Sequence, residues 1–211
     1  MRYWTLCREF YRQFRDQYHT TGSILPSSRA LARCLTRPLR QAAPPRRILE
    51  VGPGTGAVTA EIVRCLKPGD QLDIVEINAQ FVAVVKNRFA EEPDFRRVWN
   101  QSKIIHAPLQ EVPGQAVYDF IISGLPLNNF SLALVEDIFQ SYQRLLKPTG
   151  TLSYFEYVWI RDMKMALVGA EDKQRLQSLS VYLADKIRRH QIGEEVTMLN
   201  VPPAVARHLR F

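Results

Sequence analysis

Hydrophobic and polar residues follow two different patterns along the chain after residue 45. Short apolar runs predict strands, and the longer stretches between them, apolar at every third or fourth position, predict helices. The predicted strands are 47–51, 71–76, 102–106, 118–123 and 151–158, and the predicted helices are 57–66, 78–90 and 131–147. The turn sequences KPGD (67–70) and KPTG (147–150) each end a helix before a strand. This alternation predicts an α/β fold, a parallel sheet covered by helices.

The two ends of the chain depart from that regular alternation. Residues 161–191 predict one long helix or two short ones, and EEVTMLNV at 194–201 predicts a further strand before two prolines. QAAPP at 41–45 reads as a linker. We therefore expect a basic helical region, 1–45, that binds a membrane and acts as a lid, and a sheet-containing domain, 46–211.

Residues 2–19 predict an amphipathic helix with an aromatic face. At about 100° per residue, one arc of roughly 120° holds the aromatic residues, and Arg8, Arg12 and Arg15 line its edge. One interpretation is a helix docked on the sheet. The other is a helix in a membrane interface, where aromatic rings favour the boundary and arginines reach lipid phosphates. In that case the membrane-binding residues are Trp4, Arg8, Phe10, Tyr11, Arg12, Phe14 and Arg15.

The charge of the chain is concentrated at its N-terminal end. Residues 1–47 hold ten arginines, no lysine and two acids, a net charge of +8, whereas the 18 basic and 19 acidic residues that follow sum to −1. A basic end on a neutral body favours a polyanionic partner, either nucleic acid or an anionic membrane surface. No apolar run approaches the roughly 18–20 residues of a membrane span. The N-terminus lacks a secretory pattern and the three cysteines match no metal or redox spacing, so we expect a cytoplasmic protein without a metal ion.

Three glycines, Gly52, Gly54 and Gly56, separate the strand at 47–51 from the helix that follows. Glycine lets the backbone turn sharply and pass close to a ligand that a Cβ atom would exclude. The first turn of the following helix presents free N–H groups. This strand–loop–helix unit predicts a nucleotide-type binding site.

Two acids narrow the choice of ligand. Glu76 ends the next strand, where a carboxylate can accept hydrogen bonds from both hydroxyls of a ribose. Glu50 precedes the first glycine; it would repel a pyrophosphate but suits a ligand with a cationic amino-acid end. S-Adenosylmethionine combines an ammonium, a sulfonium and a ribose, so it is the predicted cofactor, with S-adenosylhomocysteine as product. The alternative is that both acids are merely solvated strand ends.

Three motifs in order resemble those of class I S-adenosylmethionine-dependent methyltransferases: ILEVGPGTG (48–56), LDIVEIN (72–78) and YDFIISGLPL (118–127). Within that superfamily the chain is similar to the bacterial phospholipid N-methyltransferases, which share SGLPL, PSSRALA (26–32) and VPPA (201–204). The resemblance implies a Rossmann-like α/β fold, with a mostly parallel seven-stranded sheet flanked by helices and an N-terminal amphipathic helix.

The resemblance also implies which residues bind the cofactor. Where many class I enzymes have an Asp for the adenine amino group, this chain has Ala107 and Pro108, so adenine recognition passes to backbone groups or to Gln110. The full predicted set is Glu50, Gly52, Pro53, Gly54, Thr55, Gly56, Glu76, Ile77, Leu109, Gln110 and Ser123.

SGLPL (123–127) resembles the N-P-P-Y and N-L-P-Y loops with which amino-methylating enzymes hold an amine through backbone carbonyls. Pro126 has no N–H, which should leave the carbonyls of Gly124 and Leu125 free to accept from the substrate nitrogen. Gly124 and Leu127 replace the Asn and Tyr of those loops, which favours an aliphatic amine over a flat nucleobase. The resemblance adds Tyr157 as an amine contact, so the predicted catalytic residues are Gly124, Leu125, Pro126 and Tyr157.

The predicted reaction is N-methylation of the head-group amine of a membrane lipid, with phosphatidylethanolamine and its methylated intermediates towards phosphatidylcholine as the preferred acceptors. The alternatives are another amino-lipid, such as ornithine lipid, and rRNA adenine N6-dimethylation. The RNA reaction would need an N-L-P-Y or N-P-P-Y loop and usually a further helical domain. We expect a monomer that lies peripherally on the inner face of the cell membrane, binds an anionic phospholipid surface and binds no nucleic acid.

Overall fold

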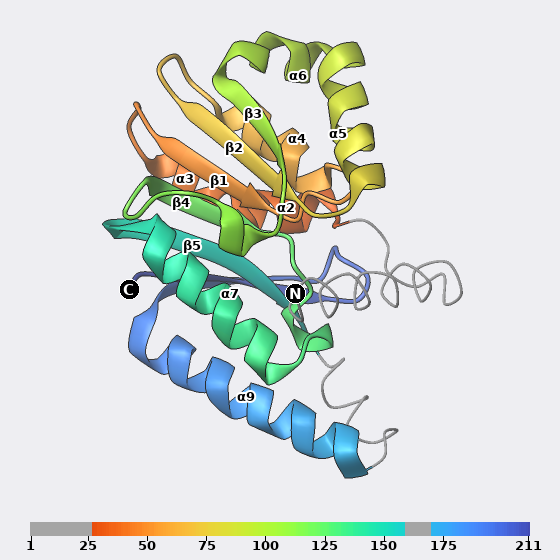
Figure 1. The fold of residues 1–211 in the computed structure, drawn as a ribbon, viewed down its shortest axis with the longest axis vertical. Coiled ribbons are helices and arrows are strands. Elements are labelled where there is room, and N and C mark those ends of the chain that lie inside the picture. The colour runs from red at the N-terminus through yellow and green to blue at the C-terminus, as the bar shows by residue number, and fades with distance from the viewer. Residues whose placement is uncertain (1–26, 159–169) are drawn as a thin grey trace.

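Seven strands form a single sheet in the order β3-β2-β1-β4-β5-β7-β6, with helices on both faces (Figure 1). This computed structural model describes residues 27–158 and 170–211. The strands are β1 (Arg47–Val51), β2 (Gln71–Glu76), β3 (Ser102–His106), β4 (Tyr118–Ser123), β5 (Leu146–Tyr157), β6 (Gln191–Thr197) and β7 (Ala204–Leu209). The helices are α2 (Arg29–Leu35), α3 (Arg37–Gln41), α4 (Ala57–Cys65), α5 (Ala79–Glu91), α6 (Pro93–Arg97), α7 (Leu132–Leu145) and α9 (Ala170–His190). Short 3-10 turns are η1 (Trp99–Gln101), η2 (Leu109–Glu111) and η3 (Leu127–Asn129).

Strands β1 to β5 run parallel, and β7 runs antiparallel to both β5 and β6. The predicted seven-stranded, mostly parallel, Rossmann-like sheet is therefore confirmed. The chain builds β1, β2 and β3 outwards to one side, then returns to place β4 on the other side of β1. The loops after β1 and β4 therefore diverge at the carboxyl edge of the sheet, which is where open α/β sheets bind ligands.

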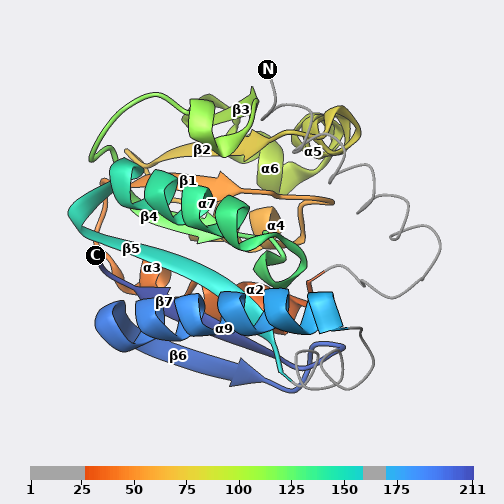
Figure 2. The ribbon, with the colours of Figure 1, turned by 60° about the horizontal axis from the view of Figure 1, so that its bottom comes forward.

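Two hydrophobic cores lie on the two faces of the sheet, because successive side chains of each strand point in opposite directions. In β1, Leu49 points into the core under α7 and α9, whereas Ile48 points into the core under α2, α4, α5 and α6. Figure 2 shows α7 and α9 side by side in front of the sheet. Both cores are needed because the central strands are buried on both faces.

Two predicted strand boundaries are wrong. β5 begins at Leu146 rather than at residue 151, because hydrogen bonds from residues 116 and 117 pair the chain with the end of α7 at once. KPTG then forms an irregularity inside the strand. The strand expected at 194–201 spans Gln191–Thr197, and residues 198–203 turn the chain into β7. Pro202 and Pro203 have no N–H groups with which to extend a ladder.

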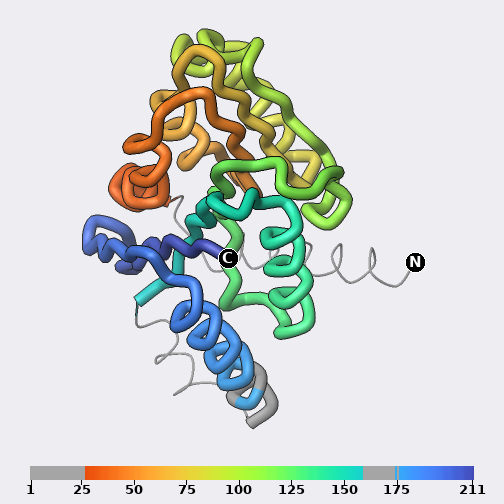
Figure 3. Tube along the Cα trace, turned by 90° about the vertical axis from the view of Figure 1, so that its left-hand side faces the viewer, coloured from red at the N-terminus to blue at the C-terminus, as the bar shows by residue number. Residues whose placement is uncertain are grey.

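Helix α2 anchors the N-terminal part of the described chain. The Ser28 hydroxyl caps it by accepting from the Leu31 N–H at 3.1 Å, and Leu31 and Leu35 are fully buried. Helix α2 packs against α4, β6 and β7 (Figure 3). The predicted amphipathic helix over 2–19 lies outside the described residues, so its membrane-binding role and the division at residue 45 stay predictions. Within residues 27–158 and 170–211, no helix is long and apolar enough to cross a bilayer.

Candidate cofactor and acceptor site

The glycine loop after β1 has the left-handed backbone that glycine favours. Gly52, Gly54 and Gly56 have φ values of +68°, +55° and +83°. A Cβ on Gly52 would lie 2.6 Å from the Leu125 side chain, so Gly52 lets the loop after β4 approach. A Cβ on Gly54 would meet nothing within 4 Å. The first glycine therefore serves packing, whereas Gly54 borders open space that a ligand can occupy.

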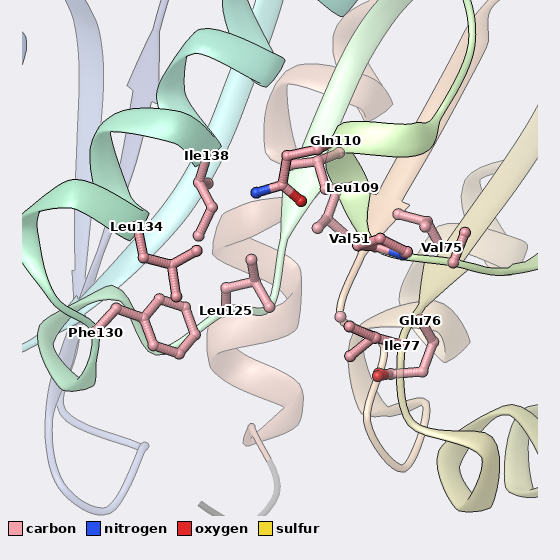
Figure 4. A pocket seen from close by; sticks show the side chains of 13 residues that line it. Val51, Val75, Glu76, Ile77, Leu109, Gln110, Leu125, Phe130, Leu134 and Ile138 are labelled. Atoms are coloured by element: carbon pink, nitrogen blue, oxygen red, sulfur yellow. The ribbon is translucent and has the colours of Figure 1, made fainter. Parts of the chain in front are cut away.

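A cavity opens beside this loop, at the carboxyl ends of β1, β2 and β4 (Figure 4). The empty space beside the loop amounts to about 440 Å³, part of which is open solvent. Its lining residues are Val51, Gly52, Val75, Glu76, Ile77, Ala107, Pro108, Leu109, Gln110, Leu125, Phe130, Leu134 and Ile138. Glu76 is the one ionisable side chain among them, and Figure 4 shows it across the cavity from Phe130 and Leu134. The cavity thus has a polar end near β2 and an apolar end near α7.

Glu50 is a buried carboxylate with one oxygen left over. Its side chain is 1% exposed, and its Oε1 accepts from the Thr59 hydroxyl at 3.0 Å. Among the described residues, Oε2 has no hydrogen-bond partner. Burial raises the pKa of Glu50 to about 8, even though Thr59 and the Arg88 charge pull it down. A cationic ligand group would relieve this cost, so Glu50 is poised for an ammonium.

Glu76 is held at the end of β2 by backbone N–H groups. Its Oε1 accepts from the Asn78 N–H at 2.8 Å. Burial raises the pKa of Glu76, although the N–H groups of Asn78, Gly54 and Ile77 oppose the shift. Because its carboxylate reaches the glycine loop and lines the cavity, it can accept hydrogen bonds from ribose hydroxyls there.

The predicted cofactor residues fall into three groups. Gly52, Glu76, Ile77, Leu109 and Gln110 line the cavity, and their contact with the cofactor stays a prediction. A second group neighbours Gly52 in the chain but does not line the cavity: Glu50, Pro53, Gly54, Thr55 and Gly56.

Ser123 forms the third group, because its hydroxyl supports the structure and does not face the cavity. It is fully buried, accepts from the Tyr142 hydroxyl at 2.7 Å and accepts from the Leu125 N–H at 3.2 Å. The side chain therefore fixes the start of the loop after β4.

The loop after β4 differs from its prediction at one carbonyl. Pro126 has φ −80° and ψ 75°, an inverse γ-turn, which brings the Leu127 N–H to 3.0 Å from the Leu125 carbonyl oxygen. The expectation that the Leu125 carbonyl is free is therefore wrong. No group in the described chain donates to the Gly124 carbonyl, while the Gly124 N–H donates to Val51. Gly124 is thus the better-placed acceptor, and Leu127, 1% exposed, lies in the core.

Tyr157 lies at the end of β5 but does not line the cavity. Its ring packs edge-on against Phe155, with centroids 5.1 Å apart, on the α2 side of the sheet. The neighbouring Glu156 accepts from the Arg207 guanidinium at 2.8 Å, so it is committed to an ion pair. The role of Tyr157 as an amine contact stays a prediction.

Sequence reasoning missed the apolar end of the cavity and a brace on its loop. Phe130, Leu134 and Ile138 are spaced four apart on and before α7, a helical pattern that also describes an ordinary core face. The brace is Arg88, whose Nη1 donates to the carbonyl oxygens of Gly56 (2.5 Å) and Thr55 (3.1 Å). No local pattern marks Arg88, because it reaches the loop from α5.

Comparison with known proteins defines the class. A methyltransferase-domain family matches residues 48–150. An ornithine lipid N-methyltransferase from Singulisphaera acidiphila is 31% identical over 142 residues, which cover 66% of this chain and 72% of that protein. The chain therefore belongs to the class I S-adenosylmethionine-dependent methyltransferases, and S-adenosylmethionine is its cofactor. Within the class, it is related to lipid N-methyltransferases such as the Singulisphaera enzyme.

Other relatives share the domain more loosely. A ribosomal RNA small subunit methyltransferase A from Synechococcus is 27% identical over 168 residues, 78% of this chain but only 51% of that protein. The O-methyltransferase TomG from Streptomyces achromogenes, solved with S-adenosylmethionine, superimposes with a TM-score of 0.60 at 20% identity, covering 86% of this chain and 78% of that one. Geranyl diphosphate C-methyltransferase from Streptomyces coelicolor gives 0.60 at 14% identity, covering 86% and 79%. At these identities the two structures show the fold alone.

The residues present fit this cofactor. The unpartnered Oε2 of Glu50 can accept from the ammonium, Glu76 can accept from the ribose, and Gly54 leaves space for the ligand between them. Leu109, Pro108 and Gln110 after β3 lie where an adenine ring would need an apolar slot and a polar edge.

Proposed function

We propose that this methyltransferase methylates the head-group amine of a membrane amino-lipid. The observation that carries the proposal is the apolar end of the cavity, which is lined by Leu125, Phe130, Leu134 and Ile138. Gly124 precedes Leu125 in the chain, and its carbonyl oxygen accepts no hydrogen bond from a described residue. An aliphatic amine needs an apolar surround with one or two acceptors for its N–H groups. The relation to an ornithine lipid N-methyltransferase supports the same chemistry.

When bound, the cofactor would supply a methyl group on its sulfonium sulfur. A neutral amine nitrogen would attack the methyl carbon in line, the carbon–sulfur bond would break with S-adenosylhomocysteine as the leaving group, and the methylated ammonium would lose a proton to solvent. Only a neutral amine can attack, and the apolar side chains lower the pKa of a buried ammonium group. The Gly124 carbonyl accepts from the amine and directs its lone pair towards the cofactor. Positioning of this kind contributes most of the rate in a single displacement.

The membrane acceptors to compare are phosphatidylethanolamine and ornithine lipid. Both present a primary alkyl amine, so the apolar end of the cavity accommodates either one. The Singulisphaera relative favours ornithine lipid, and the SGLPL resemblance favours phosphatidylethanolamine. RNA is the contrasting acceptor, because a ribosomal RNA small subunit methyltransferase A matches 78% of this chain at 27% identity.

The test is a radiolabel transfer assay with three separate acceptors. Purified protein and labelled S-adenosylmethionine are incubated with vesicles that contain phosphatidylethanolamine, with vesicles that contain ornithine lipid, or with unmodified small-subunit rRNA. We expect label in a lipid fraction and none in RNA. Labelled adenine without a lipid product would overturn the proposal.

A pair of neighbouring variants on α7 sharpens this test. Leu134→Asn places an amide at the apolar end of the cavity and should lower lipid methylation by about tenfold or more, since a polar group there favours the charged amine. Ala133→Asn introduces the same amide at an exposed position and should leave the turnover unchanged.

A further inference from the structure

The turn between β6 and β7 carries a cluster of exposed apolar side chains, here called the apolar tip. Its members are Val196 (61% exposed), Met198 (61%), Leu199 (81%) and Val201 (69%). Scattered exposed apolar residues are ordinary, but four within six positions form a contiguous feature that marks an interaction site.

The apolar tip is held in place by a buried polar residue. Asn200 is 3% exposed, and its Oδ1 accepts from the Ser28 N–H at 2.9 Å while its Nδ2 donates to the Pro202 carbonyl at 2.7 Å. The Leu199 N–H donates to the Thr197 hydroxyl at 3.3 Å. Since the polar side chain turns inward and is satisfied, the apolar neighbours on both sides of it point outward.

The apolar tip lies at the same edge of the sheet as the cofactor loop. Ala204, the first residue of β7, pairs with Tyr157 at the carboxyl end of β5 and with Thr197 at the end of β6. In Figure 1 the dark-blue β6–β7 turn lies on the side of the sheet where α5 begins and near the first residues of α2. The contact with Ser28 also places it beside the first described residues, which belong to the region 1–45 that the sequence predicts to bind a membrane.

The chemistry of this surface suits a lipid bilayer. Residues 196–206 contain no charged side chain, so none has to be desolvated on entering an apolar layer. The four side chains are exposed at the end of β6 and on the turn that follows it. Arg29, the residue after Ser28, donates from its Nε to Glu61 at 3.0 Å. Its side chain is 64% exposed, so its other N–H groups can reach a lipid phosphate beside the tip.

We propose that the apolar tip inserts into the outer part of an anionic lipid bilayer and turns the carboxyl edge of the sheet towards the membrane surface. The inference rests on the proposed lipid substrate and says how that substrate reaches the cavity. With the tip inserted, the opening beside Gly54 and Gly124 faces the head groups, so an amine can enter while its acyl chains stay in the bilayer.

The test compares matched serine variants in vesicle co-sedimentation. The double variant Met198→Ser, Leu199→Ser removes the two central side chains of the tip. Val181→Ser changes an equally exposed valine on α9, away from the tip. With vesicles of phosphatidylethanolamine and phosphatidylglycerol, we expect the double variant to lose on the order of tenfold or more in partitioning, because apolar burial drives insertion. Val181→Ser should bind as wild type does.

Two further measurements keep the outcomes distinct. Cofactor affinity and the thermal midpoint should match wild type in both variants, and Leu199→Trp should raise vesicle binding, since Trp favours the interface. Vesicle binding by the double variant equal to that of wild type would overturn the insertion, even if lipid methylation is found. Weaker binding by the double variant, in a protein that methylates no lipid, would keep the insertion and reject the proposed function. A concentration-dependent dimer that the double variant abolishes, with vesicle binding unchanged, would assign the tip to contact between copies and overturn the insertion.

Discussion

Two buried ionisable groups lie at opposite ends of β1, and their hydrogen-bond partners differ completely. Arg46, just before the strand, is 3% exposed and forms an ion pair with the equally buried Asp70. Glu50, four residues later, is 1% exposed and has one unpartnered oxygen among the described residues. The same strand therefore has an ionisable group with all its hydrogen bonds made (saturated) at one edge of the sheet, and one with an unmade hydrogen bond (unsaturated) at the other.

The Arg46–Asp70 pair is complete in itself. The Arg46 N–H and Nε donate to one Asp70 oxygen at 2.8 and 3.1 Å, and the guanidinium also donates to the carbonyls of Leu39, Ala42 and Cys65. Burial opposes the ionisation of Asp70, but Arg46 and the Lys67 N–H hold its pKa below the usual value. All of its bonds are made within the protein, so the pair fixes α3, β1 and the loop before β2 together.

The contrast teaches how to recognise the functional edge of this sheet. A buried ionisable group whose hydrogen bonds are all made stabilises the folded state. One with an unmade hydrogen bond destabilises it, unless a bound ligand supplies the missing partner. Among the described residues, buried side-chain atoms without a hydrogen-bond partner remain on Glu50, Glu195 and His208. The atoms of Glu195 and His208 lie 3.5 Å from each other on β6 and β7, whereas Glu50 lies at the carboxyl edge, where the cavity opens.

The largest effect is expected from breaking the saturated pair. Asp70→Ala leaves the Arg46 charge buried without its partner and should lower the free energy of unfolding by about 3–5 kcal/mol. Because the pKa of Asp70 is lowered in the folded state, this deficit should be full above pH 4 and shrink as pH falls below about 4. Urea unfolding at pH 7 and pH 3 measures both. Unchanged stability at pH 7 would show that the pair does not bind these elements together.

A substitution at the unsaturated end, at Glu50, is expected to change the free energy of unfolding in the opposite direction. In the unfolded chain Glu50 ionises near 4.5, and in the folded protein near 8, so wild type loses stability as pH rises through that window. Glu50→Gln removes the charge and should raise the free energy of unfolding by on the order of 5 kcal/mol above pH 8, with little change at pH 4. Urea unfolding across this pH range measures the difference.

The variant Glu50→Gln, although more stable, should bind the cofactor more weakly. At pH 7 the wild-type Glu50 is mostly protonated, so pairing with the cofactor ammonium should release up to one proton. Calorimetry in buffers of different ionisation enthalpy detects that proton, and Glu50→Gln should release none and bind about tenfold or more weakly. Equal proton release by the two proteins would show that Glu50 does not pair with the cofactor ammonium.

The smallest effect concerns two glycines with the same backbone strain. Gly54 and Gly69 have φ of +55° and +88°, so an alanine at either should cost about 1–2 kcal/mol of stability. Only Gly54→Ala should also abolish cofactor binding, because its methyl group projects into the space beside the cavity, whereas Gly69 faces Pro45. Thermal unfolding and calorimetry on both variants check this. Cofactor binding by Gly54→Ala at wild-type strength would place the ligand elsewhere.

Local pattern was enough for most of the architecture and for the cofactor end of the site. Strand and helix positions follow from hydrophobic periodicity, which is a property of consecutive residues, and β1 to β4 have the predicted bounds. The glycine spacing and the acids at 50 and 76 predict a cofactor site from sequence alone, because they lie in or beside loops that directly follow a strand. The antiparallel last strand needed the family resemblance, and only the structure showed that β7 pairs with both β5 and β6, since pairing partners are not encoded in either strand alone.

Tertiary structure alone decided the remaining features. The apolar end of the cavity exists because the first turns of α7 fold back over the loop after β4, so Phe130 and Leu134 become lining residues and Leu127 becomes core. Arg88 braces a loop thirty-two residues away, and Asn200 meets Ser28 across 172 residues of chain. These contacts join segments that the sequence separates, and their physical basis is burial and hydrogen bonding between faces that meet only after the sheet has closed.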